Sequence, residues 1–173
     1  YNTLYIQATT VPGGKFYKAP TPTVTPTPTP ALGQISKEQI QKGWAKYGNG
    51  KAPAATASAT FAEVANKYPI LKKYPGLIPA VAMKESSGGQ AKTKNWLNWA
   101  LYVPSYNQTD PNQVIRDMAR AIGSDDSSSS HYYKKFRETG NIMDFLNQYA
   151  PRSENNTDLY HNQLLEWMKM FNG

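Results

Sequence analysis

One carboxylate of this chain stands among apolar neighbours. Glu85 follows Ile78 and Val81 by seven and four residues, a spacing that puts all three side chains on one face of a helix. Burial on that face would raise the pKa of the carboxyl, and a carboxyl that keeps its proton near neutral pH can act as a general acid toward a glycosidic oxygen. The alternative is a glutamate in a last helical turn that reaches water or pairs with Lys84 or Lys94.

A short segment that follows Glu85 is rich in aromatic and amide side chains. Trp96 and Trp99 have flat apolar faces suited to stacking on sugar rings, and Asn95 and Asn98 could offer amides to N-acetyl groups. Each has an ordinary structural alternative, since paired tryptophans often fill a core and asparagines often cap turns.

Several chemistries are excluded or disfavoured by composition. The chain has no cysteine, which rules out disulfides, cysteine-ligated zinc, iron–sulfur clusters and a thiol nucleophile. Two histidines, His131 and His161, argue against a histidine-rich metal site. We therefore predict a site without a metal or an organic cofactor.

Helices must position these residues, because the apolar pattern from residue 35 onward has helical spacing and alternates only briefly near residues 99–103. We predict an all-α or nearly all-α fold, with a loop over residues 51–58. The expected helices cover residues 37–47, 61–68, 77–86, 111–123, 131–138, 142–149 and 158–171, and their expected N-caps are Ser36, Thr60, Asp110, Asn141 and Thr157.

The composition changes near residue 33, which predicts two parts, an N-terminal segment over residues 1–33 and a helical domain over residues 34–173. Six of the thirteen prolines precede residue 31, and no acidic residue precedes Glu38. The Thr/Pro-rich run over residues 21–30 is expected to be an extended spacer of roughly 30 Å, the alternative being a disordered tail. Residues 1–18 show no signal-peptide pattern, so export would require a signal already removed.

The formal charge of +7 favours anionic partners. The basic residues are dispersed, with no helix-turn-helix or finger pattern, so we predict no specific nucleic-acid binding. No apolar run approaches the roughly 20 residues of a membrane helix. We expect a monomer.

Three segments resemble one family. Ala80-Val-Ala-Met-Lys-Glu-Ser-Ser-Gly-Gly89 resembles the catalytic helix of lysozyme-like peptidoglycan glycosidases. Asn95-Trp-Leu-Asn-Trp-Ala100 is similar to the cleft segment of glucosaminidases of glycoside hydrolase family 73, and the Tyr-Ala-Pro sequence that begins at Tyr149 is similar to a segment that closes the same cleft. Their order and spacing match over about residues 61–171.

The resemblance implies a lysozyme-like helical domain and an exported, extracellular or cell-surface enzyme that cleaves the glycan backbone of peptidoglycan, as a glucosaminidase (a hydrolase) or a lytic transglycosylase. It makes Glu85 the general acid and puts the hydroxyl of Tyr149 near the cleaved bond, although that ring could also belong to the core. Glu154 and Asp110 are candidates for a second carboxylate; Glu154 could instead cap the last helix, and the substrate's own acetamido group could replace both. The implied sugar-binding residues are Ser86, Asn95, Trp96, Asn98 and Trp99.

The sequence departs from the family in two places. The Gly-Leu-Met-Gln segment of many lytic transglycosylases is absent, and Leu97 or Ala100 replaces the glycine expected after the aromatic residue of the cleft segment. A non-catalytic glycan-binding domain on the same fold is the alternative function.

Overall fold

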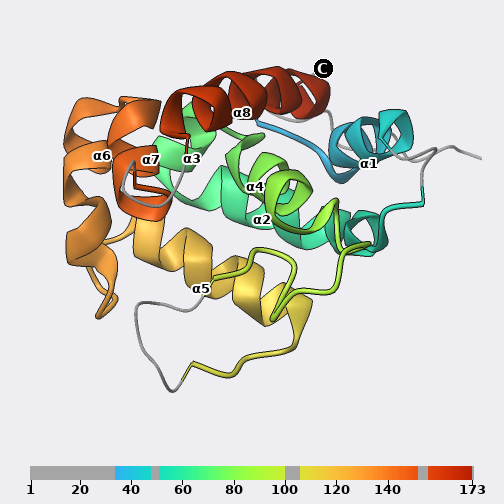
Figure 1. The fold of residues 1–173 in the computed structure, drawn as a ribbon. Coiled ribbons are helices and arrows are strands. Elements are labelled where there is room, and N and C mark those ends of the chain that lie inside the picture. Colours follow the sequence, from blue (N-terminus) through green and yellow to red (C-terminus); the bar gives the residue numbers. More distant parts are fainter. Residues whose placement is uncertain (1–33, 48–50, 100–105, 152–155, 173) are drawn as a thin grey trace, which may run out of the picture.

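The computed structural model describes residues 34–47, 51–99, 106–151 and 156–172, and these residues are helical with no strand among them (Figure 1). The prediction of an all-α fold is confirmed for this part of the chain. The predicted spacer and most of the alternating stretch near residues 99–103 lie outside the described residues. The elements are α1 (Lys37–Lys46), η2 (Pro53–Ala57), α2 (Ser58–Lys67), α3 (Pro69–Lys73), α4 (Leu77–Ser86), α5 (Pro111–Gly123), η3 (Ser130–Tyr133), α6 (Lys134–Thr139), α7 (Ile142–Tyr149) and α8 (Thr157–Asn172), where η marks a 3-10 helix.

Three helices begin at the predicted caps. Ser36 and Gln39 form the predicted capping box, in which the Ser36 hydroxyl accepts from the Gln39 N–H at 3.1 Å and the Gln39 amide oxygen accepts from the Ser36 N–H at 2.7 Å. Asp110 and Asn141 each accept a hydrogen bond from the backbone N–H two residues later, at 3.0 and 2.9 Å. These signals lie within four consecutive residues, so the local sequence is enough to specify them.

Two predicted caps are wrong. Helix α2 begins at Ser58, and Thr60 lies in its first turn with its hydroxyl donating to Asn112 Oδ1 at 2.7 Å. Asn156 rather than Thr157 caps α8, because Asn156 Oδ1 accepts from a backbone N–H of the first turn at 3.1 Å. The buried hydroxyl of Thr157 donates instead to the Ala150 carbonyl oxygen at 3.0 Å.

Other boundaries also differ from the prediction. The expected loop over residues 51–58 contains η2, whose first residue is Pro53. Pro69 closes α2 as predicted but also opens the short α3, since proline fits the first position of a helix. The helix expected over residues 131–138 is divided into η3 and α6.

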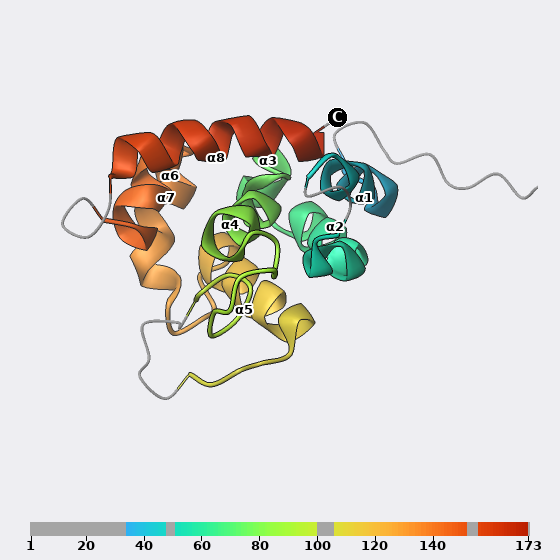
Figure 2. The ribbon, with the colours of Figure 1, turned by 45° about the vertical axis from the view of Figure 1, so that its right-hand side comes forward.

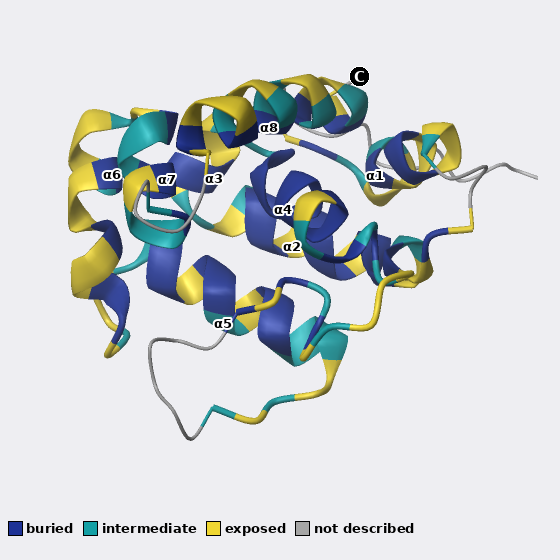
Figure 3. Cartoon of the chain, in the orientation of Figure 1, coloured by how far each residue is buried: buried dark blue, intermediate teal, exposed yellow. Residues whose placement is uncertain are grey.

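Helix α4 lies at the centre of the described fold, with α8 crossing above it from the end of α7 to α1 (Figures 1 and 2). The sequence predicts one apolar stripe on this helix, but residues 77–83 are all buried, so α4 is enclosed on every side (Figure 3). Lys84 and Glu85 are therefore the first residues of α4 to reach the surface. None of the helices in the described ranges is long and apolar enough to cross a membrane.

A sharp reversal follows α4. Ser87 caps the helix with φ 51°, and Gly88 and Gly89 continue with φ 68° and 89°. A Cβ on Gly89 would lie 2.7 Å from the indole nitrogen of Trp96, so only glycine fits this turn. The chain thereby returns across the end of α4 and brings residues 95–99 beside Glu85.

Candidate functional site

Glu85 is half-buried and accepts one hydrogen bond on each carboxylate oxygen. The Tyr160 hydroxyl donates to Oε1 at 2.8 Å, and the Asn98 side-chain amide donates to Oε2 at 3.3 Å. The three residues come from the end of α4, the segment after its reversal, and the first turn of α8. The fold thus joins positions separated by up to 75 residues around one carboxylate.

The ion pairs considered for Glu85 from its sequence neighbours are not formed. Lys84 Nζ donates to Gln163 Oε1 at 3.1 Å and lies 5.2 Å from the centroid of the Tyr160 ring. Lys94 Nζ lies 5.9 Å from the centroid of the Tyr106 ring. Within the described ranges Glu85 has neutral hydrogen-bond donors and no ion-pair partner.

Tyr160 is the site residue that the sequence analysis missed. Tyr160 precedes Leu164 and Met168 by four and eight residues, a spacing that indicates the apolar face of the last helix, and its side chain is only 3% exposed. Burial, and then the nearby charge of Glu85 and the hydrogen bond to it, raise the pKa of the Tyr160 hydroxyl well above its ordinary value of 10.0. The available signal was general: a buried tyrosine needs a partner for its hydroxyl.

Tyr149 lies beside Tyr160, with ring centroids 6.4 Å apart in an edge-on arrangement. The hydroxyl of Tyr149 donates its proton to the Leu97 carbonyl oxygen at 2.5 Å. Its ring also stacks on that of Phe145, at 5.3 Å between centroids. Tyr149 therefore links the end of α7 to the segment that carries Asn98.

Ser86 and Asn95 use their polar atoms inside the protein. Buried Ser86 Oγ lies 2.8 Å from the Trp96 carbonyl oxygen, to which it can donate, and accepts from the Gly89 N–H at 2.8 Å. The buried Asn95 amide donates to the Trp99 carbonyl oxygen at 2.7 Å, and its oxygen accepts from the Trp99 N–H at 3.0 Å. Both side chains fix the shape of the segment, which is the turn-capping alternative considered for Asn95.

The other residues of the segment differ in exposure. Trp99 is 3% exposed and packs edge-on against Tyr106, at 5.6 Å between centroids, so it belongs to the core. Trp96 is half-buried and contacts the Gly89 turn. Asn98 is exposed and has the left-handed φ of 47°, which directs its amide toward Glu85.

The two candidates for a second carboxylate do not add to this site. Glu154 lies outside the described residues. Asp110 caps α5 through its hydrogen bond to the Asn112 N–H. In the described part of the chain, no group of three or more histidine, cysteine or acidic residues could hold a metal ion.

A separate hollow of about 470 Å³ lies between α3 and α8 and contains none of the predicted site residues. Its lining consists of Lys73, Tyr74, Asn162, Leu165, Glu166, Met168, Lys169 and Asn172. Tyr74 and Lys73 both contact the Gly140 carbonyl oxygen, at 2.5 and 3.4 Å, so two of its wall residues hold α3 to the α6–α7 turn.

No protein-family model, no curated protein and no solved structure matches this chain.

Proposed function

We propose that residues 34–173 form a lysozyme-like peptidoglycan glycosidase in which Glu85 protonates the glycosidic oxygen of the leaving sugar. One observation carries the proposal: a half-buried carboxylate, at the point where a fully enclosed helix reaches the surface, is held by a tyrosine hydroxyl and an amide instead of a cation. A carboxylate fixed in this way and still reachable from solvent is suited to proton transfer.

The hydrogen bonds suggest how the transfer would proceed. Tyr160 holds Oε1 with the shorter contact, whereas Asn98 reaches Oε2 only at 3.3 Å, so Oε2 is the oxygen that would carry the proton to the substrate. Once the proton has moved to the leaving oxygen, both donors stabilise the carboxylate that remains. Donors already in place where negative charge develops lower the barrier without reorganisation.

The half-buried Trp96 and the exposed Asn98 are the members of the predicted sugar-binding set that a glycan could touch directly. Ser86 and Asn95 would act by holding that surface in shape. We also propose that the protein is exported and that the Thr/Pro-rich run holds the enzyme away from a surface; both statements rest on the sequence pattern and the family resemblance.

The test compares the protein with Glu85→Gln on purified peptidoglycan, with mass spectrometry of the soluble products. We expect muropeptide release from the unchanged protein alone and a melting temperature for Glu85→Gln at or above that of the unchanged protein, because the amide removes a partly desolvated charge. Reducing N-acetylglucosamine, reducing N-acetylmuramic acid or anhydro-N-acetylmuramic acid ends would identify the cleaved linkage and the reaction type. Release by a folded Glu85→Gln variant would contradict the role of Glu85.

The second candidate is a glycan-binding domain without catalysis. It is favoured by the internal use of Ser86 and Asn95 and by the hydrogen bond that occupies the Tyr149 hydroxyl proton. Binding to several chemically distinct walls without any released product would support this candidate over the enzyme.

A further inference from the structure

The net charge of the helical domain comes from one half of its sequence. Residues 34–99 contain ten lysines, no arginine and three acidic residues, whereas residues 100–173 contain seven basic and nine acidic residues. The two halves also differ in how many of their basic residues form ion pairs. All six described basic residues of the second half form ion pairs, namely Arg116, Arg120, Lys134, Lys135, Arg137 and Lys169.

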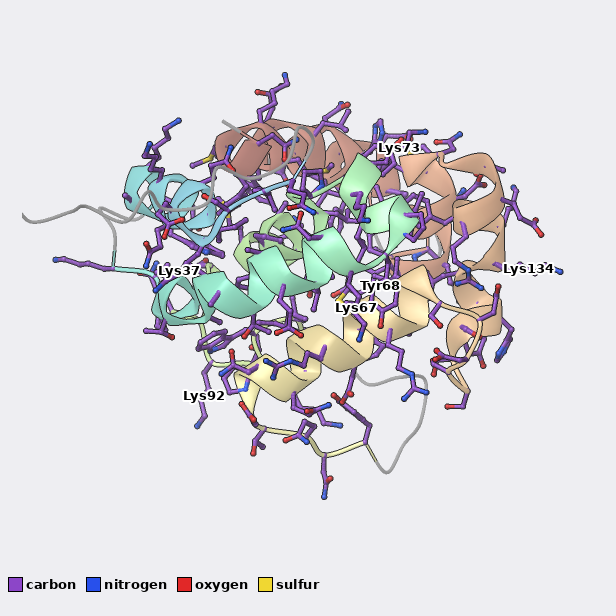
Figure 4. All side chains as sticks on the ribbon, turned by 180° about the vertical axis from the view of Figure 1, so that it is seen from behind. Lys37, Lys67, Tyr68, Lys73, Lys92 and Lys134 are labelled. Carbon is purple, nitrogen blue, oxygen red and sulfur yellow. The ribbon has the colours of Figure 1, made fainter. Side chains whose placement is uncertain are left out.

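The lysines of the first half are exposed and uncompensated. None of the ten forms an ion pair with a carboxylate of the described ranges, and one of the three acidic residues, Glu63, is engaged by Arg116 at 2.9 Å. Seen with α2 in front, Lys37, Lys67, Lys73 and Lys92 are all in view (Figure 4). Lys134, which pairs with Glu138, is in view too, but the other four form no ion pair within the described ranges.

Three of these lysines lie within seven consecutive residues, Lys67, Lys72 and Lys73, and we call them the α2–α3 lysine cluster. Buried Ile70 and Leu71 anchor α3 and leave Lys72 and Lys73 outside. Lys67 Nζ lies 5.4 Å from the Tyr68 centroid. Lys73 Nζ lies 5.2 Å from the Tyr74 centroid and also donates to the Gly140 carbonyl oxygen at 3.4 Å. These contacts with neutral rings position the ammonium groups and keep their charge available.

We propose that this lysine surface binds a flexible polyanion of repeating phosphodiesters without bases, such as a polyol-phosphate polymer. The unpaired cations beside α2 are lysines, because Arg116 is paired with Glu63 and Arg120 is paired with Asp126. Arginine forms paired hydrogen bonds with planar partners, such as a carboxylate or the edge of guanine, whereas lysine acts as a point charge on a flexible stem. Exposed lysines that form no ion pair suit a simple chain of phosphates. The proposal does not rest on the glycosidase, since binding is measured without cleavage.

The experiment measures binding of the full chain to purified poly(glycerol phosphate) over a range of salt concentrations, with single-stranded DNA of equal phosphate number as the second probe. The test variant is Lys67→Gln/Lys72→Gln/Lys73→Gln. The matched control, Lys134→Gln/Lys135→Gln/Lys169→Gln, removes the same charge from ion-paired positions. Circular dichroism melts establish that both variants are folded.

We expect binding by the unchanged protein that weakens with salt. Each phosphate contact contributes about 0.7 to the slope of log K against log salt concentration, so the test variant loses about 2 from this slope. Near about 0.1 M salt this loss corresponds to roughly 100-fold weaker binding of the test variant, and we expect less than about threefold weaker binding of the control. Equal losses of binding affinity in the two variants would show that net charge alone determines binding and would overturn the proposed surface. Absence of binding at low salt, or tighter binding of DNA than of poly(glycerol phosphate), would overturn the assigned partner.

Discussion

Tyr160 is the residue whose ionisation depends most clearly on its surroundings. Its raised pKa means that the folded protein holds this proton more tightly than the unfolded chain, whose tyrosines ionise near 10. The stabilisation is therefore complete below about pH 10 and is lost as pH rises above that value toward the folded pKa. Tyr106, whose pKa burial and Asp117 also raise, contributes in the same direction.

We predict that Tyr160→Phe loses less stability between neutral pH and pH values above about 10 than the unchanged protein does. The measurement is denaturant unfolding followed by circular dichroism at each pH. Exposed Leu159→Ala, a change without a titrating group on the same helix, is the control and should leave the pH dependence unchanged. An identical alkaline loss in the Tyr160→Phe variant would show that this hydroxyl is not held as described.

Asn98 combines a left-handed backbone with a side chain that reaches Glu85, and two substitutions separate these features. Asn98→Gly removes the amide without backbone strain, so we expect roughly tenfold lower muropeptide release, the equivalent of one hydrogen bond, with unchanged or higher stability. Asn98→Ala should show the same loss of release and a lower melting temperature. Equal melting temperatures for the two variants would contradict the left-handed conformation.

Spacing on one helix identified Glu85 as unusual, but its partners could not be predicted in the same way. The family resemblance implies a sugar-binding role for Asn98, and the spacing of Tyr160 indicates only a place on the apolar face of the last helix. Both contacts depend on a chain reversal or on the docking of a distant helix. Neither is encoded in the spacing of neighbouring residues.

At the level of elements, α1 and α8 approach closely at Gly43. A Cβ at this position would lie 2.3 Å from Phe171 Cδ1 and 2.9 Å from the Met170 carbonyl oxygen, and that backbone atom cannot rotate away. We predict that Gly43→Ala lowers the free energy of unfolding by about 1–3 kcal/mol, as overpacking does, although alanine favours helix more than glycine. Denaturant unfolding measures the change.

The control for this substitution is Ala45→Gly on the exposed side of α1, which should lower stability by about 0.5–1 kcal/mol through helix propensity alone. If Gly43→Ala instead stabilises the protein by a similar amount, propensity outweighs the contact and the α1–α8 packing is looser than described.

The predicted helix starts succeeded or failed for a physical reason. Ser36, Asp110 and Asn141 cap through backbone groups two or three residues away, so the sequence identifies them. Thr60 and Thr157 have the right residue type, but their hydroxyls find partners in other elements. Long α-helices with strong periodicity were predicted best, whereas α3, η2 and η3 are too short to leave a periodic pattern.

For the whole molecule, Ile35 marks where the described fold is tied to the chain that precedes it. Buried Ile35 exchanges two hydrogen bonds with the Asn66 side chain, at 3.0 and 2.7 Å. We predict that a chain starting at Gln34 keeps the melting temperature of the full protein. A chain starting at Lys37 loses this pair, the capping box and a buried side chain, so its unfolding free energy should fall by at least about 2 kcal/mol.

Calorimetry or denaturant unfolding of the two truncated chains tests the boundary predicted at residue 33. Loss of stability already in the chain that starts at Gln34 would place part of the folded unit within residues 1–33.

The hydrogen bond from Tyr160 to Glu85 also determines when, during synthesis of the chain, the site can form. Because Tyr160 follows Glu85 by 75 residues, every nascent chain that ends between them has Glu85 without its hydroxyl partner and α4 without its cover. If Glu85 is the acid, the site stays incomplete during synthesis until α8 has been made and has packed on α4.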